Sequence, residues 1–321
     1  MANLITGGTG VIGAELAHIL VGREEETVLF DIAINLERIN DIKDKVKVVQ
    51  GDLSNWSEVC NVVNSNKITN IYHLGSMLNV MSEDNPWGSF QTNVIGTCNV
   101  LEAARLFDVE KIMFTSSMAT YDLEAGTEIT DTTIQRPTTI YGVGKLYSEG
   151  LGRFYRTKFG LDFRSIRYPG VIGPGVRTPG HWGEPMIENA VLGKPYECFV
   201  VEDSAIPMMF FKDAARAADR VLQAPKENIK MVNYNVAGCI SAITAKELEQ
   251  AIKRRIPDAV VIYKISPGIM EKPKIFSRIR VWDDSYAKKE WGWKPAYPTI
   301  DDIVFAFIEE IKTHPNRYGL A

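Results

Sequence analysis

A glycine-rich segment near the start of the chain restricts its possible folds more than any other feature. After the apolar strand pattern at residues 2–5, the chain reads Gly-Gly-Thr-Gly-Val-Ile-Gly from Gly7 to Gly13, and a helical pattern follows. Glycines at this spacing let the backbone turn tightly and approach a pyrophosphate, while the following helix offers free N–H groups at its N-terminus. A glycine-rich turn without a ligand is the alternative. The strand, turn and helix context favours a dinucleotide site, with predicted contacts at Gly7, Gly10, Val11, Ile12 and Gly13.

An acidic residue follows this segment at the distance typical of dinucleotide-binding folds. Asp31 ends the second predicted strand, at residues 27–31. Its carboxylate can accept hydrogen bonds from the ribose hydroxyls of adenosine, and it would repel a 2′-phosphate. The sequence therefore predicts NAD in preference to NADP. Two alternatives stay open at this point, because Arg38 lies nearby and because a solvated aspartate at a strand end would look the same.

Short apolar runs alternate with helical patterns through the first half of the chain. The predicted strands are residues 4–6, 27–31, 46–50, 70–74, 111–115 and 162–167, and the predicted helices are residues 11–21, 56–63, 89–107 and 141–159. This alternation is typical of a parallel sheet with helices on both faces. We therefore predict an α/β fold, a Rossmann-type doubly wound parallel sheet with a smaller C-terminal substrate-binding domain.

The composition changes after Tyr168, where glycine and proline cluster through residues 169–183. Such clusters indicate loops. We predict that residues 1–168 form the NAD-binding Rossmann domain and that residues 205–238 return to it. Residues 169–204 and 239–321 would then form the smaller substrate or cap domain.

Charge and cysteine usage exclude several classes of function. Lys and Arg total 36 against 40 Asp and Glu, a formal net charge of −4, so neither nucleic acid nor membrane is an expected partner. The four cysteines lie far apart, without a CxxC pair or a histidine at ligand spacing, so we expect neither disulfides nor a metal site. A signal peptide and a long apolar run are also missing from the pattern. We predict a cytoplasmic protein with a small-molecule substrate.

A tyrosine and a lysine four residues apart predict proton-transfer chemistry. Tyr141 and Lys145 would share one face of the helix that begins there. A free phenol has a pKa near 10, and a nearby cation would lower that pKa toward neutral pH. In isolation such a pair is usually a surface feature. Ser117 strengthens the case, because it lies in the hydroxyl-rich stretch that follows the strand at residues 111–115, where it can polarise a carbonyl group.

With these residues the chain resembles the extended short-chain dehydrogenase/reductases, the group that includes nucleotide-sugar epimerases and dehydratases. Further matches to that family are Gly51-Asp52-Leu53, His73-Leu74-Gly75-Ser76 and Asn93. The resemblance implies additional NAD contacts beside Tyr141 and Lys145. They are Asp52, Leu53, Leu74, Gly75, Ser76, Asn93 and Tyr168. It also implies a homodimer formed through the helices at residues 89–107 and 141–159.

Within that group the chain is most similar to the short-chain type of L-threonine 3-dehydrogenase. The similar segments are residues 136–145, 167–172, 206–210 and 283–293. Sugar-nucleotide epimerases usually have an Arg-Asp pair where this chain has Pro207-Met208-Met209, and that pair helps to hold a diphosphate sugar. The resemblance therefore implies NAD-dependent oxidation of a small secondary alcohol, with L-threonine giving 2-amino-3-ketobutyrate.

Two segments near the expected substrate depart from the threonine enzymes. One is Leu78-Asn79-Val80, and the other is the run from His181 to Met186. The predicted substrate contacts are Leu78, Asn79, Ser117, Met118, Tyr141 and Met186. A related hydroxy compound is therefore an open alternative to threonine. His181 and Glu184 suggest acid-base chemistry, although a mobile cap loop explains their polarity equally well.

Two other functions remain to be weighed. A nucleotide-sugar 4-epimerase or dehydratase would keep NAD tightly bound through each turnover. A non-catalytic dinucleotide-sensing protein would bind the cofactor without turnover. Ser117, Tyr141 and Lys145 argue against the second alternative, because binding alone does not need a tuned phenol.

Overall fold

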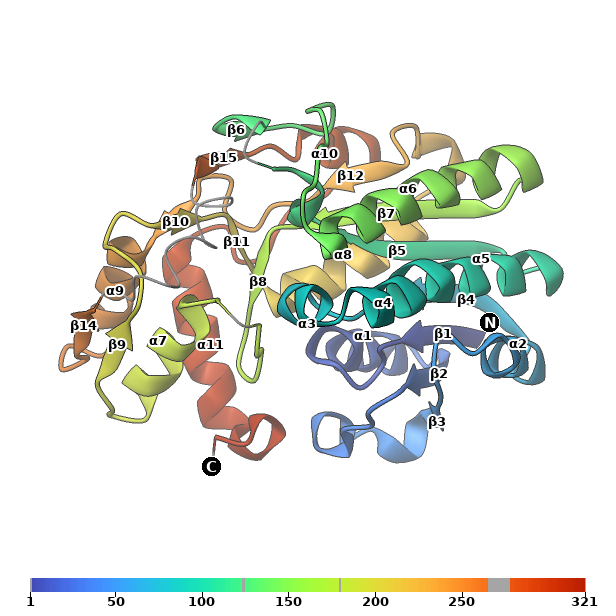
Figure 1. Cartoon of the computed structure of the whole chain (residues 1–321). Helices are drawn as coiled ribbons and strands as arrows, with labels where there is room; N and C mark the ends of the chain where they lie inside the picture. The colour runs from blue at the N-terminus through green and yellow to red at the C-terminus, as the bar shows by residue number, and fades with distance from the viewer. Residues whose placement is uncertain (1, 123–124, 179, 265–277, 321) are drawn as a thin grey trace.

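The computed structural model describes residues 2–122, 125–178, 180–264 and 278–320. A seven-stranded parallel sheet lies at its centre, in the order β12-β7-β5-β4-β1-β2-β3 (Figure 1). These strands are β1 (Ala2–Thr6), β2 (Glu26–Asp31), β3 (Lys47–Gln50), β4 (Ile68–His73), β5 (Lys111–Ser117), β7 (Asp162–Tyr168) and β12 (Asn233–Asn235). The chain order reverses between β1 and β4, which is the position where open sheets of this class bind ligands. The predicted Rossmann-type doubly wound parallel sheet is confirmed.

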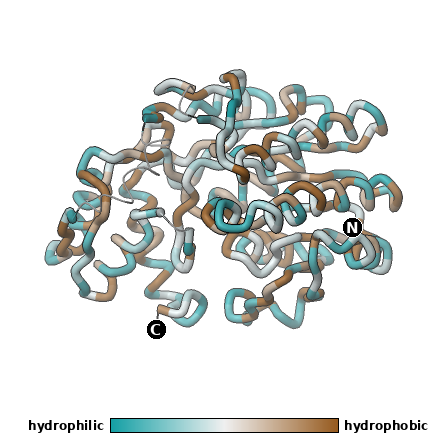
Figure 2. Tube along the Cα trace, in the orientation of Figure 1, coloured by the Kyte–Doolittle hydropathy of each residue, from teal (hydrophilic) through white to brown (hydrophobic). Residues whose placement is uncertain are grey.

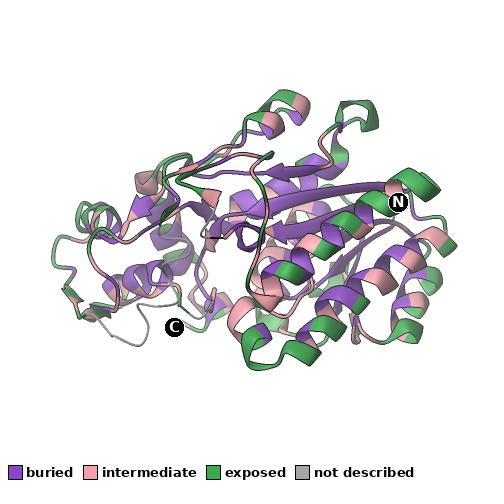
Figure 3. Ribbon diagram, turned by 45° about the horizontal axis from the view of Figure 1, so that its top comes forward, coloured by how far each residue is buried: buried purple, intermediate pink, exposed green. Residues whose placement is uncertain are grey.

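Helices cover both faces of the sheet. The helices α1 (Val11–Gly22) and α8 (Phe211–Gln223) pack on one face, and α2 (Trp56–Ser65), α5 (Gly96–Leu106) and α6 (Ile140–Phe159) pack on the other. Figure 3 shows most of the central strands buried, while the helices that cover the sheet alternate between buried and exposed residues. The edge strand β3 is only partly buried. Figure 2 shows the matching pattern of hydropathy. Strands covered on both faces have little polar alternation, which explains the near-continuous apolar runs in the sequence.

The predicted helix at residues 89–107 is interrupted by one wider turn. The helix α4 (Pro86–Ser89) continues through the π-helical turn η3 (Phe90–Ile95) into α5. Such turns are rare and frequently occur at functional sites. Here the turn contains Asn93, whose side chain is buried.

Beside the sheet and its covering helices lies a second region of the molecule, which has its own apolar core. It contains α7 (Gly183–Val191), α9 (Ala245–Lys253) and α11 (Ile300–Thr313). Short two-stranded ladders complete this side of the molecule. They pair β8 (Gly170–Ile172) with β11 (Met208–Phe210), β9 (Tyr196–Cys198) with β14 (Val261–Tyr263), β10 (Ala205–Ile206) with β13 (Ile243–Thr244), and β6 (Glu128–Ile129) with β15 (Val281–Trp282).

The predicted domain boundaries stay a prediction, and two features bear on them. Residues 205–238 contribute α8 and β12 to the sheet side. The helix α10 (Ser285–Trp291), from the stretch assigned to the second domain, packs against β12 and places Trp291 and Trp293 in the core that includes α1 and α8. Among the described helices, none is long and apolar enough to cross a membrane.

Two glycines in α6 test how closely this helix packs on the sheet. A Cβ atom at Gly152 would lie 2.1 Å from Cζ of Phe163 in β7, whereas at Gly150 no atom of the described residues lies within 4 Å. We expect Gly152→Ala to lower the free energy of unfolding by about 1–3 kcal/mol through overpacking. Gly150→Ala should raise that free energy by about 0.5–1 kcal/mol, because alanine favours the helix. Urea denaturation of both variants measures the difference, and equal effects would contradict the close packing of α6.

Candidate active site

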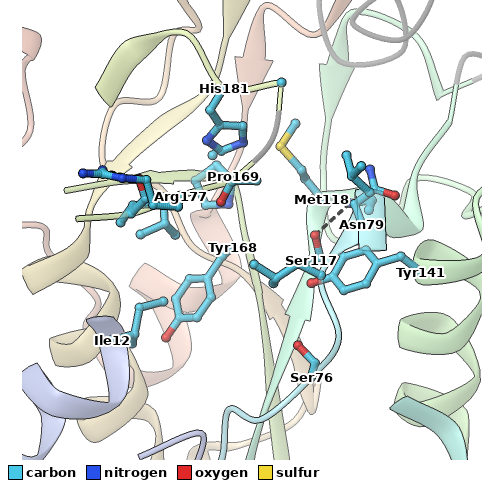
Figure 4. A pocket seen from close by; sticks show the side chains of 18 of the residues that line it. Ile12, Ser76, Asn79, Ser117, Met118, Tyr141, Tyr168, Pro169, Arg177 and His181 are labelled. Carbon is cyan, nitrogen blue, oxygen red and sulfur yellow. Dashed lines mark hydrogen bonds between the residues drawn. The ribbon is translucent and has the colours of Figure 1, made fainter. Parts of the chain in front are cut away.

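A cavity of about 970 Å³ opens at the carboxyl ends of the central strands (Figure 4). Loops of the second region cover its other side, so both parts of the molecule contribute to the wall. Many of the predicted site residues lie on this wall. They are Gly7, Gly10, Val11, Ile12, Gly13, Leu74, Ser76, Leu78, Asn79, Ser117, Met118, Tyr141, Lys145 and Tyr168. The fold therefore brings the predicted cofactor and catalytic residues into one space.

The glycine-rich loop has the form that a pyrophosphate requires. Gly7 has a φ of +65°, and a Cβ atom at Gly13 would lie 2.3 Å from the Gly7 carbonyl oxygen. The described residues supply no side-chain cap to α1 at Gly10, so the first-turn N–H groups are available at the cavity wall. Free N–H groups at a helix N-terminus bind anions. The loop thus fits the phosphates of a dinucleotide.

Asp31 supports this loop from the end of β2. Its Oδ2 atom accepts hydrogen bonds from Thr9 N at 3.0 Å and from Thr9 Oγ1 at 2.9 Å, and Oδ1 accepts one from Ala33 N at 3.2 Å. The carboxylate is therefore held beside the loop and lies outside the cavity lining. Its discrimination between NAD and NADP stays a prediction.

Ser117, Tyr141 and Lys145 lie together on the sheet side of the cavity (Figure 4 labels the first two). Ser117 ends β5, and the other two residues lie in the first turns of α6. Thr139 caps this helix by accepting a hydrogen bond from Gly142 N at 3.1 Å. A Cβ atom at Gly142 would lie 2.1 Å from the carbonyl oxygen of Ala119. Only glycine lets the helix begin so close to the loop that follows Ser117.

The pKa of the Tyr141 phenol moves opposite to the sequence-based expectation. Burial raises this pKa to about 12, although hydrogen bonds with Ser117 and Ser76 act to lower it. The expected tuning by Lys145 is absent from the causes that act on this phenol. Tyr141 is therefore a protonated hydrogen-bonding group at neutral pH.

Lys145 is buried and is held by the strand beneath it. Its Nζ atom donates a hydrogen bond to the carbonyl oxygen of Thr115 at 2.7 Å and lies 5.5 Å from the centre of the Tyr141 ring. Burial lowers the pKa of Lys145 to about 7, while the charge of Glu149 acts in the opposite direction. The ammonium is desolvated and ready to exchange a proton near neutral pH.

Four further predicted cofactor residues lie behind the cavity wall. Asp52 and Leu53 follow β3, and Leu53 packs against Gly75. Asn93 accepts a hydrogen bond from Met77 N at 2.7 Å and donates one to Met77 O at 3.0 Å. Leu53, Gly75 and Asn93 support the loop that carries Ser76 and Leu78, and any direct cofactor contact remains a prediction.

The structure does not place Met186 at the cavity. This residue lies in α7, and its side chain is fully buried in the core of the second region beside Ile172 and Leu248. Because α7 turns its apolar face toward this core, Met186 makes packing contacts in place of the predicted substrate contact.

Several wall residues escaped the sequence-based site prediction. Arg38 donates a hydrogen bond to Thr9 O at 3.2 Å, and its Nε atom has no partner among the described residues. Arg177 and His181 reach the same cavity from the loop after β8. Only the fold shows that these side chains meet at one cavity. In the sequence, charged residues within a glycine-rich loop were the feature that could have marked Arg177 and His181 as binding residues. Asn79 Oδ1 is likewise buried without a partner in the described structure, which leaves an acceptor at the cavity wall.

The phosphate-binding loop and the Ser117, Tyr141 and Lys145 group define an NAD-dependent oxidoreductase of the short-chain type. The chain belongs to the NAD dependent epimerase/dehydratase family, whose model it matches over residues 3–237. Among its relatives is the mitochondrial L-threonine 3-dehydrogenase of Bos taurus, 31% identical over 91% of this chain and 78% of that protein. NAD is the cofactor of this family.

Solved structures support the same relationship. A GalE-like L-threonine dehydrogenase from Cupriavidus necator in its holo form is 30% identical, with a TM-score of 0.86 over 96% of this chain and 99% of that chain. A monomeric L-threonine 3-dehydrogenase from a metagenome is 28% identical, with a TM-score of 0.86 over 97% of this chain and 99% of that one. A UDP-glucose 4-epimerase from Thermotoga maritima, 19% identical over 98% and 99% of the two chains with a TM-score of 0.84, shares the fold.

Tyr141→Phe tests the catalytic group. The ring still packs and only the hydroxyl is lost, so we expect turnover to fall about 10²- to 10⁴-fold while the thermal midpoint and NAD affinity stay close to those of the wild type. Tyr155→Phe in the same helix is the matched control, because Tyr155 lies about four turns, roughly 21 Å, further along α6 and its hydroxyl donates to Glu102. Steady-state kinetics with NADH absorbance provide the measurement. A Tyr141→Phe enzyme with most of its activity would contradict the assignment.

Proposed function

We propose that this protein oxidises the secondary hydroxyl group of L-threonine to give 2-amino-3-ketobutyrate, with NAD as the oxidant. The observation that carries the proposal is the grouping of Ser117, Tyr141 and Lys145 on the wall of a cavity that also contains the glycine-rich loop. Relatives named as L-threonine dehydrogenases align with nearly the whole chain and add support.

Three side chains have separate tasks in this reaction. Once its own proton has passed to the neutral amine of Lys145, Tyr141 accepts the proton of the substrate hydroxyl, and Ser117 donates a hydrogen bond to the oxygen as it becomes a carbonyl. Lys145, buried on the same helix with a pKa of about 7, is the group that takes up the proton Tyr141 must lose before it acts as a base. When bound, NAD would supply the hydride acceptor for the carbon that bears the hydroxyl group, so that the substrate would lose one proton and one hydride in total. The glycine-rich loop would hold the cofactor phosphates.

The cavity favours a small substrate over a nucleotide sugar. Met208 and Met209, which replace the charged pair of the epimerases, are buried in β11, outside the cavity lining. This segment therefore supplies no charged partner for a diphosphate, whose loss of hydration without such a partner is costly. A non-catalytic dinucleotide sensor is also disfavoured, since binding alone does not need Ser117 and a phenol grouped with a buried lysine on the cavity wall.

Substrate oxidation provides the direct test of the proposed function. We expect NADH to form with L-threonine, because a small alcohol fits the wall without a diphosphate partner, and we expect no interconversion of UDP-glucose and UDP-galactose. Initial rates at matched substrate concentrations decide between the two reactions. Efficient epimerisation without threonine-dependent NADH would overturn the substrate and leave the catalytic group in place.

The oligomeric state and the location belong to the proposal as well. Apolar side chains stay exposed along α4 and α6, including Trp87 at 67% and Tyr147 at 55% exposure. Exposed apolar patches of this kind often mark interfaces, which supports the predicted homodimer, although one solved relative is described as monomeric. The cytoplasmic location stays a prediction. The four cysteines are free in the structure, whereas the Bos taurus relative is named as mitochondrial.

Light scattering tests the homodimer. We expect a mass near twice 35.9 kDa for the wild type, and a shift toward the monomer for Tyr147→Glu, because a carboxylate would lose its hydration in an apolar interface. Trp56→Glu, on the exposed side of α2, is the control and should leave the mass unchanged. A wild type that is monomeric at micromolar concentration would exclude the predicted dimer.

A further inference from the structure

A histidine and a glutamate form a pair on the cap side of the cavity. His181 Nδ1 lies 3.0 Å from Oε1 of Glu184, and the His181 side chain is 23% exposed at the cavity wall. Glu184 lies in the first turn of α7, and its side chain is 1% exposed. Figure 4 shows His181 on the side of the cavity opposite Ser117 and Tyr141. The pair therefore faces the catalytic group across the space left for a substrate.

Glu184 is buried with an incomplete set of partners. Its Oε2 atom has no hydrogen-bond partner among the described residues. A buried carboxylate is costly unless a cation or several donors compensate for it. Burial acts to lower the pKa of His181, but the charge of Glu184 and the hydrogen bond with it act in the other direction and prevail, so the net shift is upward. Glu184 thus favours the imidazolium form of His181.

The second nitrogen of His181 is available to a ligand. Nδ1 faces Glu184, and Nε2 makes no hydrogen bond within the described part of the chain. With Nδ1 directed at the carboxylate, the imidazolium presents its Nε2–H group toward other partners. A donor of this kind, on a charged ring at the cavity wall, is suited to an anionic acceptor.

The other cations of the wall are already engaged. Arg177 pairs with Glu188 at 2.8 Å, and Arg38 donates to the backbone of the glycine-rich loop. Lys145 donates to the backbone of β5. The wall also contains the carboxylate of Glu83, which accepts a hydrogen bond from Ile140 N at 2.9 Å. These cations are thus held by protein acceptors, whereas Nε2 of His181 has no acceptor among the described residues.

We propose that His181, held by Glu184, binds the carboxylate of the substrate and so restricts turnover to hydroxy acids, hydroxy amino acids included. This inference rests on the proposed function, because it assigns the recognition of the acid group in the alcohol that Tyr141 oxidises. It makes His181 a specificity-determining residue and Glu184 its positioning residue.

The test compares substrates with and without the carboxylate. We expect His181→Gln to raise KM for L-threonine about 10- to 100-fold, because a charge-assisted hydrogen bond is lost, while kcat stays within a few fold. L-threoninamide, which keeps the amino group and lacks the carboxylate, should be a poor substrate of the wild type and should react equally well with His181→Gln. Glu184→Gln should also raise KM for L-threonine. His181→Lys, which keeps the cation, should retain more affinity for L-threonine than His181→Gln.

A second histidine and carboxylate pair provides the control. His18 lies 3.0 Å from Asp41 on the surface, outside the cavity lining. His18→Gln should leave both kinetic constants unchanged. If His181→Gln lowers kcat/KM equally for L-threonine and its amide, the residue only shapes the loop and the proposal is overturned.

A binding measurement separates failure of this inference from failure of the proposed function. The NADH complex of each variant is titrated with 3-hydroxybutyrate and with neutral 3-hydroxybutyramide by calorimetry. Weaker binding of the acid alone to His181→Gln supports the carboxylate site, even if L-threonine is not oxidised. Two results would overturn the carboxylate site. One is equal affinity of the wild type and His181→Gln for 3-hydroxybutyrate, and the other is that neither protein binds 3-hydroxybutyrate.

Discussion

The buried ion pair between Glu149 and Arg167 supports the catalytic wall. Arg167 donates to both carboxylate oxygens, at 2.8 and 2.7 Å, which joins α6 to β7. Ser116 of β5 and Asn233 of β12 complete the coordination of the same carboxylate. Removing one partner of a buried pair costs about 3–5 kcal/mol, because the remaining charge is left uncompensated. The pair thereby fixes the helix that carries Tyr141 to three strands of the sheet.

This arrangement explains why a buried ammonium is tolerated one turn away. Lys145 and Glu149 are four residues apart in α6, and the negative charge of Glu149 opposes the loss of hydration that lowers the pKa of Lys145. Arg167 balances that negative charge and prevents Glu149 from fully stabilising the ammonium. His73, which contacts Thr6 and Thr97, stays neutral because burial and the charge of Lys145 lower its pKa to about 3. Burial and a few buried charges therefore determine the protonation states of Lys145 and His73 beneath the phenol.

Local patterns explain what the sequence predicts well. The glycine-rich loop lies within one strand-to-helix unit, and Tyr141 and Lys145 lie within one helix. Their roles can therefore be predicted from the local sequence without the fold. Long-range packing decides the rest. Met186 points into a core because of how α7 packs, and the raised pKa of Tyr141 depends on burial by several distant segments. The convergence of Arg38, Arg177 and His181 joins loops far apart in the chain.

The two walls of the cavity differ in how they are built, and this difference bears on how such enzymes change substrate. The catalytic wall combines strand ends with a helix that is fixed by buried charges, so a substitution there disturbs both folding and chemistry. The opposite wall includes the loop after β8, in which Gly175 and Gly180 have φ values of +71° and +86°. Residues that follow, His181 among them, contact the cavity from a segment that the sheet does not position. Exchange of side chains in that loop can therefore alter recognition while the proton-transfer geometry stays intact. For this reason the departures from the threonine enzymes at His181 and Trp182, which line the cavity, bear on the substrate and not on the reaction type.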